Sequence, residues 1–311
     1  MTLPQDIIGV DIAKDWIDVF HLSTSKHERI ATTEQALARF SKGVAGALVV
    51  LEASGGYERP LIEALAKAHT EYARVNPRQA REFARATGRL AKTDRVDAEV
   101  LARMGRALEL KPTPPEDPDL ARLSDLVARR GVLVGQIRAE KNRAGTTRDR
   151  WIAKEIALMI KVLDAHLAAV ETQIATLVES RDALAATQAR LSSVPGIGPA
   201  ISAVLIARLP ELGHLDPRRI ASLAGLAPHA TDSGLTRGKR RIWGGRADAR
   251  RALYVAAFIA SRYDPAMKAF RARLQAAGKP LKLVLTACAR KLLTILNAML
   301  RTGTDHRKMS P

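Results

Sequence analysis

The chain has 311 residues, which is enough for two domains that each bury a core of their own. It carries 50 lysines and arginines against 32 aspartates and glutamates, and its formal net charge of +18 favours a polyanionic partner, nucleic acid before a membrane surface. The single cysteine, Cys288, excludes a disulfide framework and a cysteine-built zinc site.

The sequence gives no indication of a membrane segment or a signal peptide. No apolar run approaches the roughly 20 residues that a membrane-spanning helix needs. The first residues lack the basic start and the apolar middle of a signal peptide. We therefore expect a cytoplasmic protein that has no membrane partner.

Residues 1–110 alternate predicted strands and helices. The segment Ile7–Asp11 is apolar at consecutive positions and then presents a carboxylate, a pattern typical of a strand whose sheet is covered by helices on both faces. Two further strands are expected to follow it as a meander. Leu48–Glu52 is another apolar run that ends in an acid. Asp11 and Glu52 are thus predicted at the rim of a rigid sheet.

Two more acids follow in the motif Lys92-Thr93-Asp94-Arg95-Val96-Asp97, where a helix is predicted to begin. On a helix, Asp94 and Asp97 stand three residues apart and share a face, and a helix N-terminus favours negative charge. Together with Asp11 and Glu52 they make four acids on three elements. Such a set is suited to hard divalent cations, and we expect Mg²⁺ there, with Mn²⁺ as the alternative.

A helix predicted after Asn76-Pro77 carries arginines at intervals of three and four residues. Such a run usually forms a solvated helix face, but this one leads directly into the acidic motif. We therefore predict phosphate contacts from its cations and the lysine that follows, Arg78, Arg81, Arg85 and Lys92. Upstream, the turn Ser54-Gly55-Gly56 lacks the Lys-Ser/Thr ending of a P-loop, so nucleotide binding is not expected there.

The segment 111–118 holds four prolines in eight residues and is predicted to be a linker, because prolines cannot continue a helix. From residue 119 to about 190, apolar residues recur at steps of three and four, which predicts a helical hairpin or a coiled coil. The seam serves either a dimer contact or a helix buried in its own domain. We favour the dimer, because the region has few aromatic residues for a large core. The seam consists of Leu120, Leu123, Leu126, Val127, Ile156, Met159, Leu163, Leu167, Val170, Ile174 and Leu177.

The pattern changes at Val194-Pro195-Gly196-Ile197-Gly198, an apolar and glycine-rich turn that precedes a predicted helix. The turn resembles a helix-hairpin-helix element, in which glycines bring backbone N–H groups and a helix N-terminus against a phosphate. A Gly-x-Gly turn can also simply connect two helices. The basic composition favours nucleic-acid contact through Gly196 and Gly198.

The last third contains a glycine-rich loop at residues 225–234 that a run of cations follows. Ser233 in this loop is placed to present its hydroxyl to a phosphodiester, although most loop serines form turns or caps. His229 is a candidate base, but a lone histidine near a proline is more often structural. The cations predicted to contact nucleic acid are Arg237, Lys239, Arg240, Arg241 and Arg246. The helices expected at about 265–277 and 281–301 look like packing elements, and a disordered tail is expected from residue 302.

Taken together, these motifs resemble one family, the DEDD insertion-sequence transposases related to the Piv DNA invertase. The resemblance covers nearly the whole chain. It implies a RuvC-like domain with an RNase H-like α/β fold at residues 1–110 and a coiled coil within residues 111–190, which also hold the linker and where we predict dimerisation. It also implies a mainly α-helical transposase domain at 191–301, before a tail at 302–311. The motifs that carry it are Gly9-Val10-Asp11-Ile12-Ala13-Lys14, Glu52-Ala53-Ser54-Gly55-Gly56-Tyr57, Lys92-Thr93-Asp94-Arg95-Val96-Asp97-Ala98, Pro195-Gly196-Ile197-Gly198, Ser233-Gly234 and Arg250-Arg251-Ala252-Leu253-Tyr254.

The same resemblance implies roles for individual residues. Asp11, Glu52, Asp94 and Asp97 correspond to a metal-binding tetrad, and Ser233 to a covalent nucleophile. Members of the family resemble site-specific recombinases that pair donor and target DNA through a bridge RNA transcribed from the element. We therefore expect the recombinase of a prokaryotic insertion sequence, associated with the nucleoid, that works with a guide RNA as a homodimer or as a synaptic tetramer.

The chemistry of the predicted site agrees with these roles. Two metal ions about 4 Å apart can activate an attacking oxygen and stabilise the leaving one. If Ser233 attacks, the broken bond is stored as a phosphoserine ester and can be rejoined to another strand. If water attacks, the protein is instead a magnesium-dependent, structure-specific endonuclease similar to a junction resolvase. A basic scaffold that only binds nucleic acid is a third interpretation, and four acids at strand ends and on one helical face argue against it.

Overall fold

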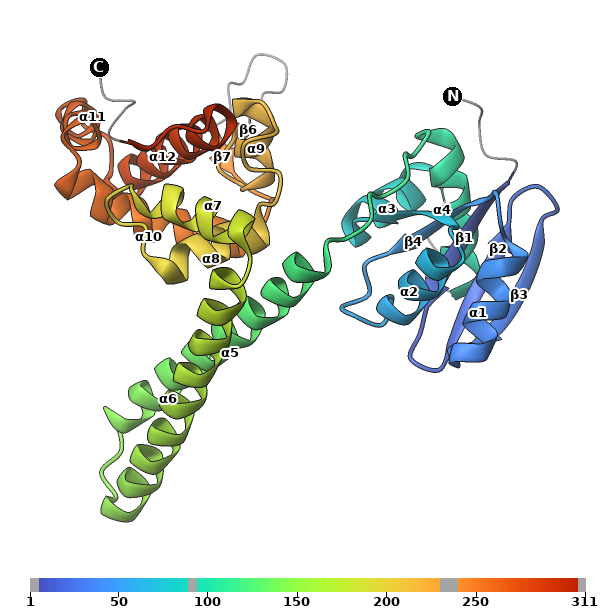
Figure 1. Cartoon of the computed structure of the whole chain (residues 1–311), viewed down its shortest axis with the longest axis horizontal. Coiled ribbons are helices and arrows are strands. Elements are labelled where there is room, and N and C mark those ends of the chain that lie inside the picture. Colours follow the sequence, from blue (N-terminus) through green and yellow to red (C-terminus); the bar gives the residue numbers. More distant parts are fainter. Residues whose placement is uncertain (1–5, 89–93, 230–239, 307–311) are drawn as a thin grey trace. The chain divides into compact units, whose positions relative to one another are not determined.

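The structure is a computed structural model that describes residues 6–88, 94–229 and 240–306, apart from the side chains of residues 94–96 and 229 (Figure 1). The chain forms two compact units, residues 1–115 and 116–311. The first unit combines a mixed sheet with helices, and the second is mostly helical. The finer division of the second part at residue 190 stays a prediction.

The first unit is built on a five-stranded sheet in the order β3-β2-β1-β4-β5. β2 pairs antiparallel with both β1 and β3, whereas β4 pairs in parallel with both β1 and β5. An antiparallel meander thus lies on one side of β1 and parallel crossovers on the other, which is compatible with the expected RNase H-like domain. The strands are β1 (Ile7–Ile12), β2 (Trp16–His21), β3 (Lys26–Ala31), β4 (Leu48–Glu52) and β5 (Glu71–Val75).

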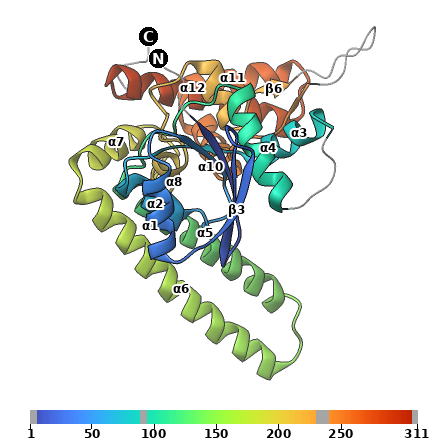
Figure 2. The same cartoon turned by 90° about the vertical axis from the view of Figure 1, so that its right-hand side faces the viewer.

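Helices cover both faces of this sheet, which explains why β1 and β4 are apolar at consecutive positions. α1 (Glu34–Gly43) and α2 (Arg59–Lys67) pack on the face that carries Ile8 and Val10 of β1. α3 (Pro77–Ala86) and α4 (Asp94–Ala107) pack on the opposite face. Figure 2 views the sheet nearly edge-on, with α1 and α2 on one side and α3 and α4 on the other.

Gly9 allows α4 to approach the central strand closely. A Cβ atom at this position would lie 1.9 Å from the carbonyl oxygen of Ala98 and 2.6 Å from the backbone nitrogen of Ala102. Neither backbone atom can move without shifting the helix, so only glycine fits. The contact fixes the first turns of α4 against β1.

The second unit begins with two long helices, α5 (Pro118–Ala144) and α6 (Arg150–Glu179), which lie side by side and antiparallel as a helical hairpin (Figures 1 and 2). Asp117 and Asp149 cap them by accepting hydrogen bonds from backbone N–H groups of the first turns. The body of the unit consists of α7 (Asp182–Ser192), α8 (Pro199–Arg208), α9 (Pro217–Leu223), β6 (Pro228–His229), β7 (Arg241–Ile242), α10 (Ala247–Tyr263), α11 (Pro265–Ala276) and α12 (Leu281–Thr302).

Much of the predicted apolar seam is buried inside this unit. Leu123 and Val127 of α5 and Ile174 and Leu177 of α6 are all at most 7% exposed and belong to one core cluster. For these residues the structure realises the alternative in which the seam packs within its own domain. Met159 differs, since it is 51% exposed. A coiled-coil geometry of the hairpin stays a prediction.

α12 is the central helix of the second unit. Val284, Cys288, Leu292 and Leu296 recur every four residues along it and are fully buried. By length and composition alone α12 could also cross a membrane, and half of its most apolar window is buried in the unit. The sequence-based expectation that no segment reaches that length is therefore too strict, although α12 packs here as a core helix.

Candidate active site

Asp11 and Glu52 occupy neighbouring positions on two parallel strands. In the register of β1 and β4, Val10 pairs with Leu51, so the two acids are the next residues along each strand. Side chains alternate between the faces of a strand, and Val50, two residues before Glu52, belongs to the core on the α4 side. The acids therefore share the face that α3 and α4 cover, and both are half-buried.

The contact between β1 and α4 brings a third acid to the same place. Ala98 lies against Gly9, on the face that also carries Asp11 two residues further along β1. Asp97 is half-buried and directly precedes Ala98 in the first turn of α4. Asp97 and Asp11 thus lie on adjoining parts of the helix and the strand. Asp94 begins the same helix, but its side chain lies outside the described residues.

The donor chemistry of this face fits a divalent cation, because hard cations take carboxylate oxygens. Among the side chains that the structure describes, no three from His, Cys, Asp and Glu converge closely enough to form a metal-binding group. Asp11, Glu52 and Asp97 each have an interaction partner within the protein. Metal binding by these three acids together with Asp94 therefore stays a prediction.

Asp18 of β2 is a further acid on this face that the sequence motifs did not reveal. It pairs with Asp11 in the antiparallel register, and paired residues point to the same face. Asp18 is 5% exposed, and Arg29 of β3 neutralises it by donating from Nε to Oδ1 at 3.0 Å and from Nη2 to Oδ2 at 2.8 Å. The Arg29 guanidinium also lies 4.9 Å from the centre of the Trp16 ring. Only the register of the strands could have placed Asp18 beside the site.

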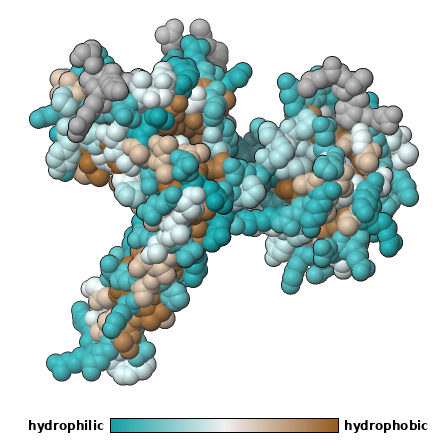
Figure 3. Space-filling view, viewed as in Figure 1, coloured by the Kyte–Doolittle hydropathy of each residue, from teal (hydrophilic) through white to brown (hydrophobic). Residues whose placement is uncertain are grey.

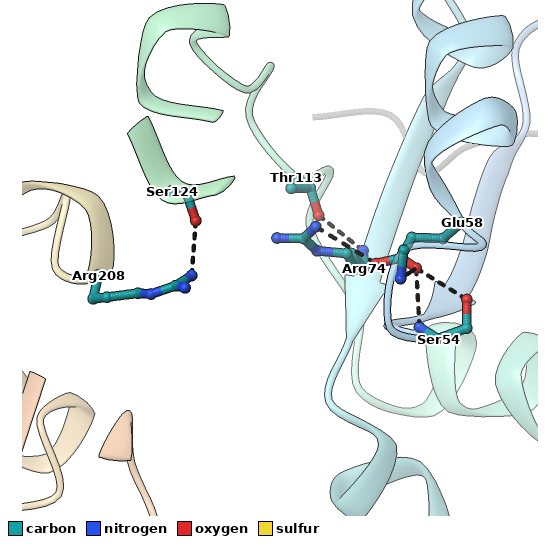
Figure 4. Close-up of polar contacts among 7 residues, drawn as sticks. Ser54, Glu58, Arg74, Thr113, Ser124 and Arg208 are labelled. Carbon is teal, nitrogen blue, oxygen red and sulfur yellow. Dashed lines mark hydrogen bonds and ion pairs between the residues drawn. The ribbon is translucent and has the colours of Figure 1, made fainter. Parts of the chain in front are cut away.

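The loop that follows Glu52 is held by a buried carboxylate, Glu58 (Figure 4). Glu58 Oε2 accepts hydrogen bonds from the Ser54 backbone N–H at 3.1 Å, the Ser54 hydroxyl at 3.0 Å and the Gly56 N–H at 2.8 Å. Burial raises the pKa of Glu58, but hydrogen bonds from the Glu58, Gly56 and Ser54 backbone and from the Ser54 hydroxyl outweigh it and hold the pKa below its ordinary value. The glycine-rich turn is thus a backbone clamp around an ionised acid, not a phosphate loop.

The same clamp reaches β5 and the start of the linker. Arg74 of β5 places Nη1 4.0 Å from Glu58 Oε1. The backbone N–H of Arg74 donates to the Thr113 hydroxyl at 2.8 Å, and the Thr113 N–H donates to the Tyr72 carbonyl at 2.7 Å (Figure 4). The segment that leaves the first unit is therefore tied along the strand that supports Glu58.

The predicted phosphate-binding arginines of α3 are on the protein surface. Arg78, Arg81 and Arg85 are exposed, and Arg78 Nε donates to Glu82 Oε1 at 2.8 Å. Lys92 lies outside the described residues. Contact of these side chains with nucleic acid stays a prediction.

The two glycines of the predicted helix-hairpin-helix turn have different local environments. Gly196 has a φ of +92°, and a Cβ there would lie 2.7 Å from the Ala256 carbonyl oxygen of α10, so the residue permits close helix packing. Gly198 is the N-cap of α8, and a Cβ atom at this position would meet no described atom within 4 Å. Packing accounts for Gly196, and phosphate binding by either glycine stays a prediction.

Ser233, Arg237 and Lys239 lie outside the described residues, but the strands that flank them are described. Pro228 of β6 pairs with Ile242 of β7, and His229 pairs with Arg241, in antiparallel register. The described residues on either side of the segment that carries Ser233 are therefore held next to each other. Arg240 and Arg241 are exposed at the return of this segment.

Arg246 is bound to the protein itself. Its Nη1 donates to Glu211 Oε2 at 2.6 Å and to the Arg208 carbonyl at 2.9 Å, and its Nη2 donates to Glu211 Oε1 at 2.8 Å. Burial raises the pKa of Glu211, but the hydrogen bonds from Arg246, a hydrogen bond from the Glu211 backbone and the charge of Arg246 outweigh it, so the pKa lies below its ordinary value. Arg208 in turn donates from Nη1 to the Ser124 hydroxyl of α5 at 2.7 Å (Figure 4). Arg246 is thus part of the joint between α8 and α10, and a contact with nucleic acid stays a prediction.

The sequence matches two models of known families. A DEDD transposase model of the IS110 type covers residues 8–147, and a model described as the transposase IS116/IS110/IS902 family covers residues 188–272. The pilin gene-inverting protein of Moraxella bovis is 27% identical over 98% of this chain and 99% of its own length. An uncharacterized 43.6 kDa protein of insertion element IS110 from Streptomyces coelicolor is 31% identical over 51% of this chain and 39% of its own length.

Proposed function

The chain belongs to the IS110 family of DEDD transposases and is an enzyme that acts on DNA, and from this premise we propose that it is the recombinase of an insertion sequence. The observation that carries the proposal is the shared face of Asp11, Glu52 and Asp97, at two strand ends and the start of one helix. On this proposal, the face binds the scissile phosphate and the enzyme cuts and rejoins DNA strands there.

A DEDD domain implies dependence on a divalent metal, and we propose Mg²⁺, with Mn²⁺ as a substitute. When bound, the metal supplies charge stabilisation at the phosphate. The protein contributes the arrangement of its acids: β1 and β4 hold two of them on a rigid sheet, and the packing of α4 on Gly9 holds the others. Glu58 holds the loop that follows Glu52 through hydrogen bonds from its backbone, and this would help to keep the Glu52 carboxylate in position for the metal.

The proposed nucleophile is Ser233. Its hydroxyl gives up a proton, its oxygen bonds to the phosphorus, and the bond from phosphorus to one deoxyribose oxygen breaks to leave a free hydroxyl end. A hydroxyl end of another strand then attacks the same phosphorus and releases the serine. Support comes from the family resemblance and from β6 and β7, which hold both ends of the serine segment together.

A guide RNA is proposed on the family resemblance and on the net charge of +18, which suits more than one polyanionic partner. The protein would then contribute backbone contacts and chemistry, while base pairing selects the donor and target sequences. The prediction places the enzyme in the cytoplasm, on the nucleoid.

We also propose a homodimer through the outer face of the helical hairpin, with a synaptic tetramer as its higher assembly. Apolar side chains gather along this hairpin in Figure 3. On α6, Trp151, Leu158 and Val162 follow at steps of seven and four and are 70%, 58% and 52% exposed. Ile152 and Met159 repeat the step of seven beside them and are also exposed. Large exposed apolar residues at helical spacing favour a partner helix.

The deciding experiment is strand cleavage of supercoiled DNA that carries the element's ends, with the cognate RNA and Mg²⁺. The reaction is stopped with denaturant and run on a denaturing gel before and after protease. The proposal expects a slow, protease-sensitive DNA species that disappears in Ser233→Ala and persists in Ser222→Ala, a control at an exposed serine of the same unit. Free nicked ends that persist in Ser233→Ala, but are lost in Asp11→Asn, would identify the alternative endonuclease that uses water.

A further inference from the structure

Residues 265–304, which form α11, α12 and their connection, contain no aspartate or glutamate. The whole chain has 32 acids in 311 residues, about one in ten, so a stretch of 40 residues would ordinarily hold about four. Eight cations occupy the same stretch: Lys268, Arg271, Arg273, Lys279, Lys282, Arg290, Lys291 and Arg301. Packing in the core accounts for the apolar side of α12, but it does not explain why the charged positions all carry the same sign.

The cations of the two helices converge around one aromatic ring. The Arg273 guanidinium carbon lies 5.3 Å, and the Lys291 ammonium nitrogen 4.6 Å, from the centre of the Phe270 ring. Burial raises the pKa of the Cys288 thiol, and the charges of Arg271 and Lys291 act against it, which places both cations near this buried residue of α12. Arg271, Arg273 and Lys291 therefore lie near one another. Together with Lys268, Lys279 and Lys282, which are exposed on the same two helices and their connection, they are called here the α11–α12 cationic surface.

No carboxylate neutralises this surface within the described part of the chain. Other cations of the second unit have acidic partners, such as Arg246 with Glu211 and Arg130 with Glu171. Asp264, just before α11, is 5% exposed; its Oδ2 lies 2.6 Å from His306 Nε2, and its Oδ1 accepts the Met267 N–H. The positive field of the α11–α12 cationic surface is thus left for an anion from outside.

We propose that the α11–α12 cationic surface binds the phosphate backbone of duplex DNA. Proteins that bind single strands stack bases on exposed aromatic rings. The Phe270 ring is half-buried under two cations, and the large apolar side chains exposed on α12, Leu281 and Leu283, are aliphatic. α11 and α12 themselves present no exposed aromatic ring, although Tyr263 at the end of α10 is 73% exposed. Cations on helices without an aromatic platform of their own suit the regular backbone of a duplex.

The inference rests on the proposed action on DNA, but not on Ser233 or on the metal. Binding is therefore measured without divalent metal, so that a failure of the cleavage chemistry leaves the result unaffected. The test variant is Lys268→Gln/Arg273→Gln/Lys279→Gln/Lys282→Gln, in which all four side chains are exposed. The control variant removes the same charge from exposed positions of the first unit, Lys26→Gln/Arg39→Gln/Lys42→Gln/Lys67→Gln.

The Kd for a 30-base-pair duplex DNA, and for duplex RNA and single-stranded DNA of the same length, is measured against salt for the full-length protein and both variants. Circular dichroism is the check on folding. The plot of log K against log salt has a negative slope, and each lost phosphate contact makes it less steep by about 0.9. The slope of the test variant should therefore be less steep by up to about 4, and its affinity for DNA should fall at least about tenfold. The control variant should change much less. An unchanged slope, or an equal loss in both variants, would overturn the proposal. A loss confined to duplex RNA, or to single-stranded DNA, would also overturn it by assigning the surface to that partner.

Discussion

In the first unit the important charges are placed by the register of a rigid sheet, whereas in the second unit they stand on helices and on a two-stranded ribbon. Asp11 and Glu52 are fixed by the pairing of β1 with β4. The acids around them are neutralised inside the protein, Asp18 by Arg29 and Glu58 by backbone N–H groups. The cations of α11 and α12 have no such acidic partners among the described residues.

This contrast separates structural charges from charges that are available to a ligand. A buried charge that the fold requires is paired at hydrogen-bond distance, because an unpaired one would cost several kcal/mol. A charge that meets DNA or a metal must instead lose its partner or never have one. The following substitutions test whether the paired charges and the close backbone contacts stabilise the folded protein.

The largest effect is expected for Gly9→Ala. The added methyl group would collide with the Ala98 carbonyl and push α4 away from β1, which should cost about 3 kcal/mol of unfolding free energy and abolish DNA cleavage. Thermal unfolding and the cleavage assay measure the two effects. Gly131→Ala is the control, because no described atom lies within 4 Å of a Cβ at this position of α5 and a helical alanine should add about 0.5–1 kcal/mol. A Gly9→Ala protein that melts and cleaves like the wild type would show that α4 does not need this contact.

Arg29→Gln should lower the free energy of unfolding by about 2 kcal/mol, because it leaves the buried Asp18 carboxylate without its charged partner. The loss stays below the roughly 3–5 kcal/mol of a fully buried pair, since the Arg29 side chain is half exposed. Denaturant unfolding gives the free energy. Adding Asp18→Asn to Arg29→Gln removes the buried charge and should recover part of the loss. If the double variant is no more stable than Arg29→Gln, the buried charge of Asp18 is not the cause.

Glu58→Gln should lower the free energy of unfolding at neutral pH by about 1.5 kcal/mol, because it removes a charged acceptor of three hydrogen bonds. The pKa of Glu58 is lower in the folded protein than its ordinary value of 4.5, so its contribution is complete above that value and is lost as the pH falls through the folded pKa. Below pH 4.5 the stability difference between wild type and variant should therefore shrink. A difference that is constant from pH 7 to pH 3 would mean that ionised Glu58 does not hold the loop.

The smallest effect is expected for Arg246→Lys, which should lower the free energy of unfolding by about 1 kcal/mol. Lysine keeps the charge but cannot make both hydrogen bonds to Glu211. The loss is small because both side chains of the ion pair are more than a third exposed. Thermal unfolding measures it, and Arg240→Lys, at an exposed position, is the control. If Arg246→Lys instead leaves stability unchanged and weakens DNA binding, Arg246 contacts DNA as the sequence predicts.

The elements that carry the acids could be predicted because their signals are local. Apolar runs that end in an acid predicted β1 and β4, and the acidic motif predicted the start of α4. The supports of the site could not be predicted in this way. Asp18 reaches the site only through strand register, and Glu58 holds a loop through backbone groups that a sequence does not distinguish.

In the second unit, local motifs predicted ligand contacts for residues whose partners in the structure lie inside the unit. Gly196 and Arg246 stand in motifs typical of phosphate contact, yet each has a partner inside the unit, because helix packing depends on residues 60 and 35 positions away in the chain, Ala256 and Glu211. The helices at 265–277 and 281–301 were predicted as packing elements. That description fits the buried side of α12, but not the cations of its outer side.

The most direct test of the central claim is a titration of the full-length protein with Mn²⁺, followed by the electron paramagnetic resonance signal of the free ion. Joint binding by the acidic face predicts saturable binding that weakens at least about tenfold in each of Asp11→Asn, Glu52→Gln and Asp97→Asn. Asp15→Asn, at an exposed turn beside β1, should bind like the wild type. If the three variants also bind Mn²⁺ like the wild type, these acids do not form a metal site and the account of the first unit is wrong.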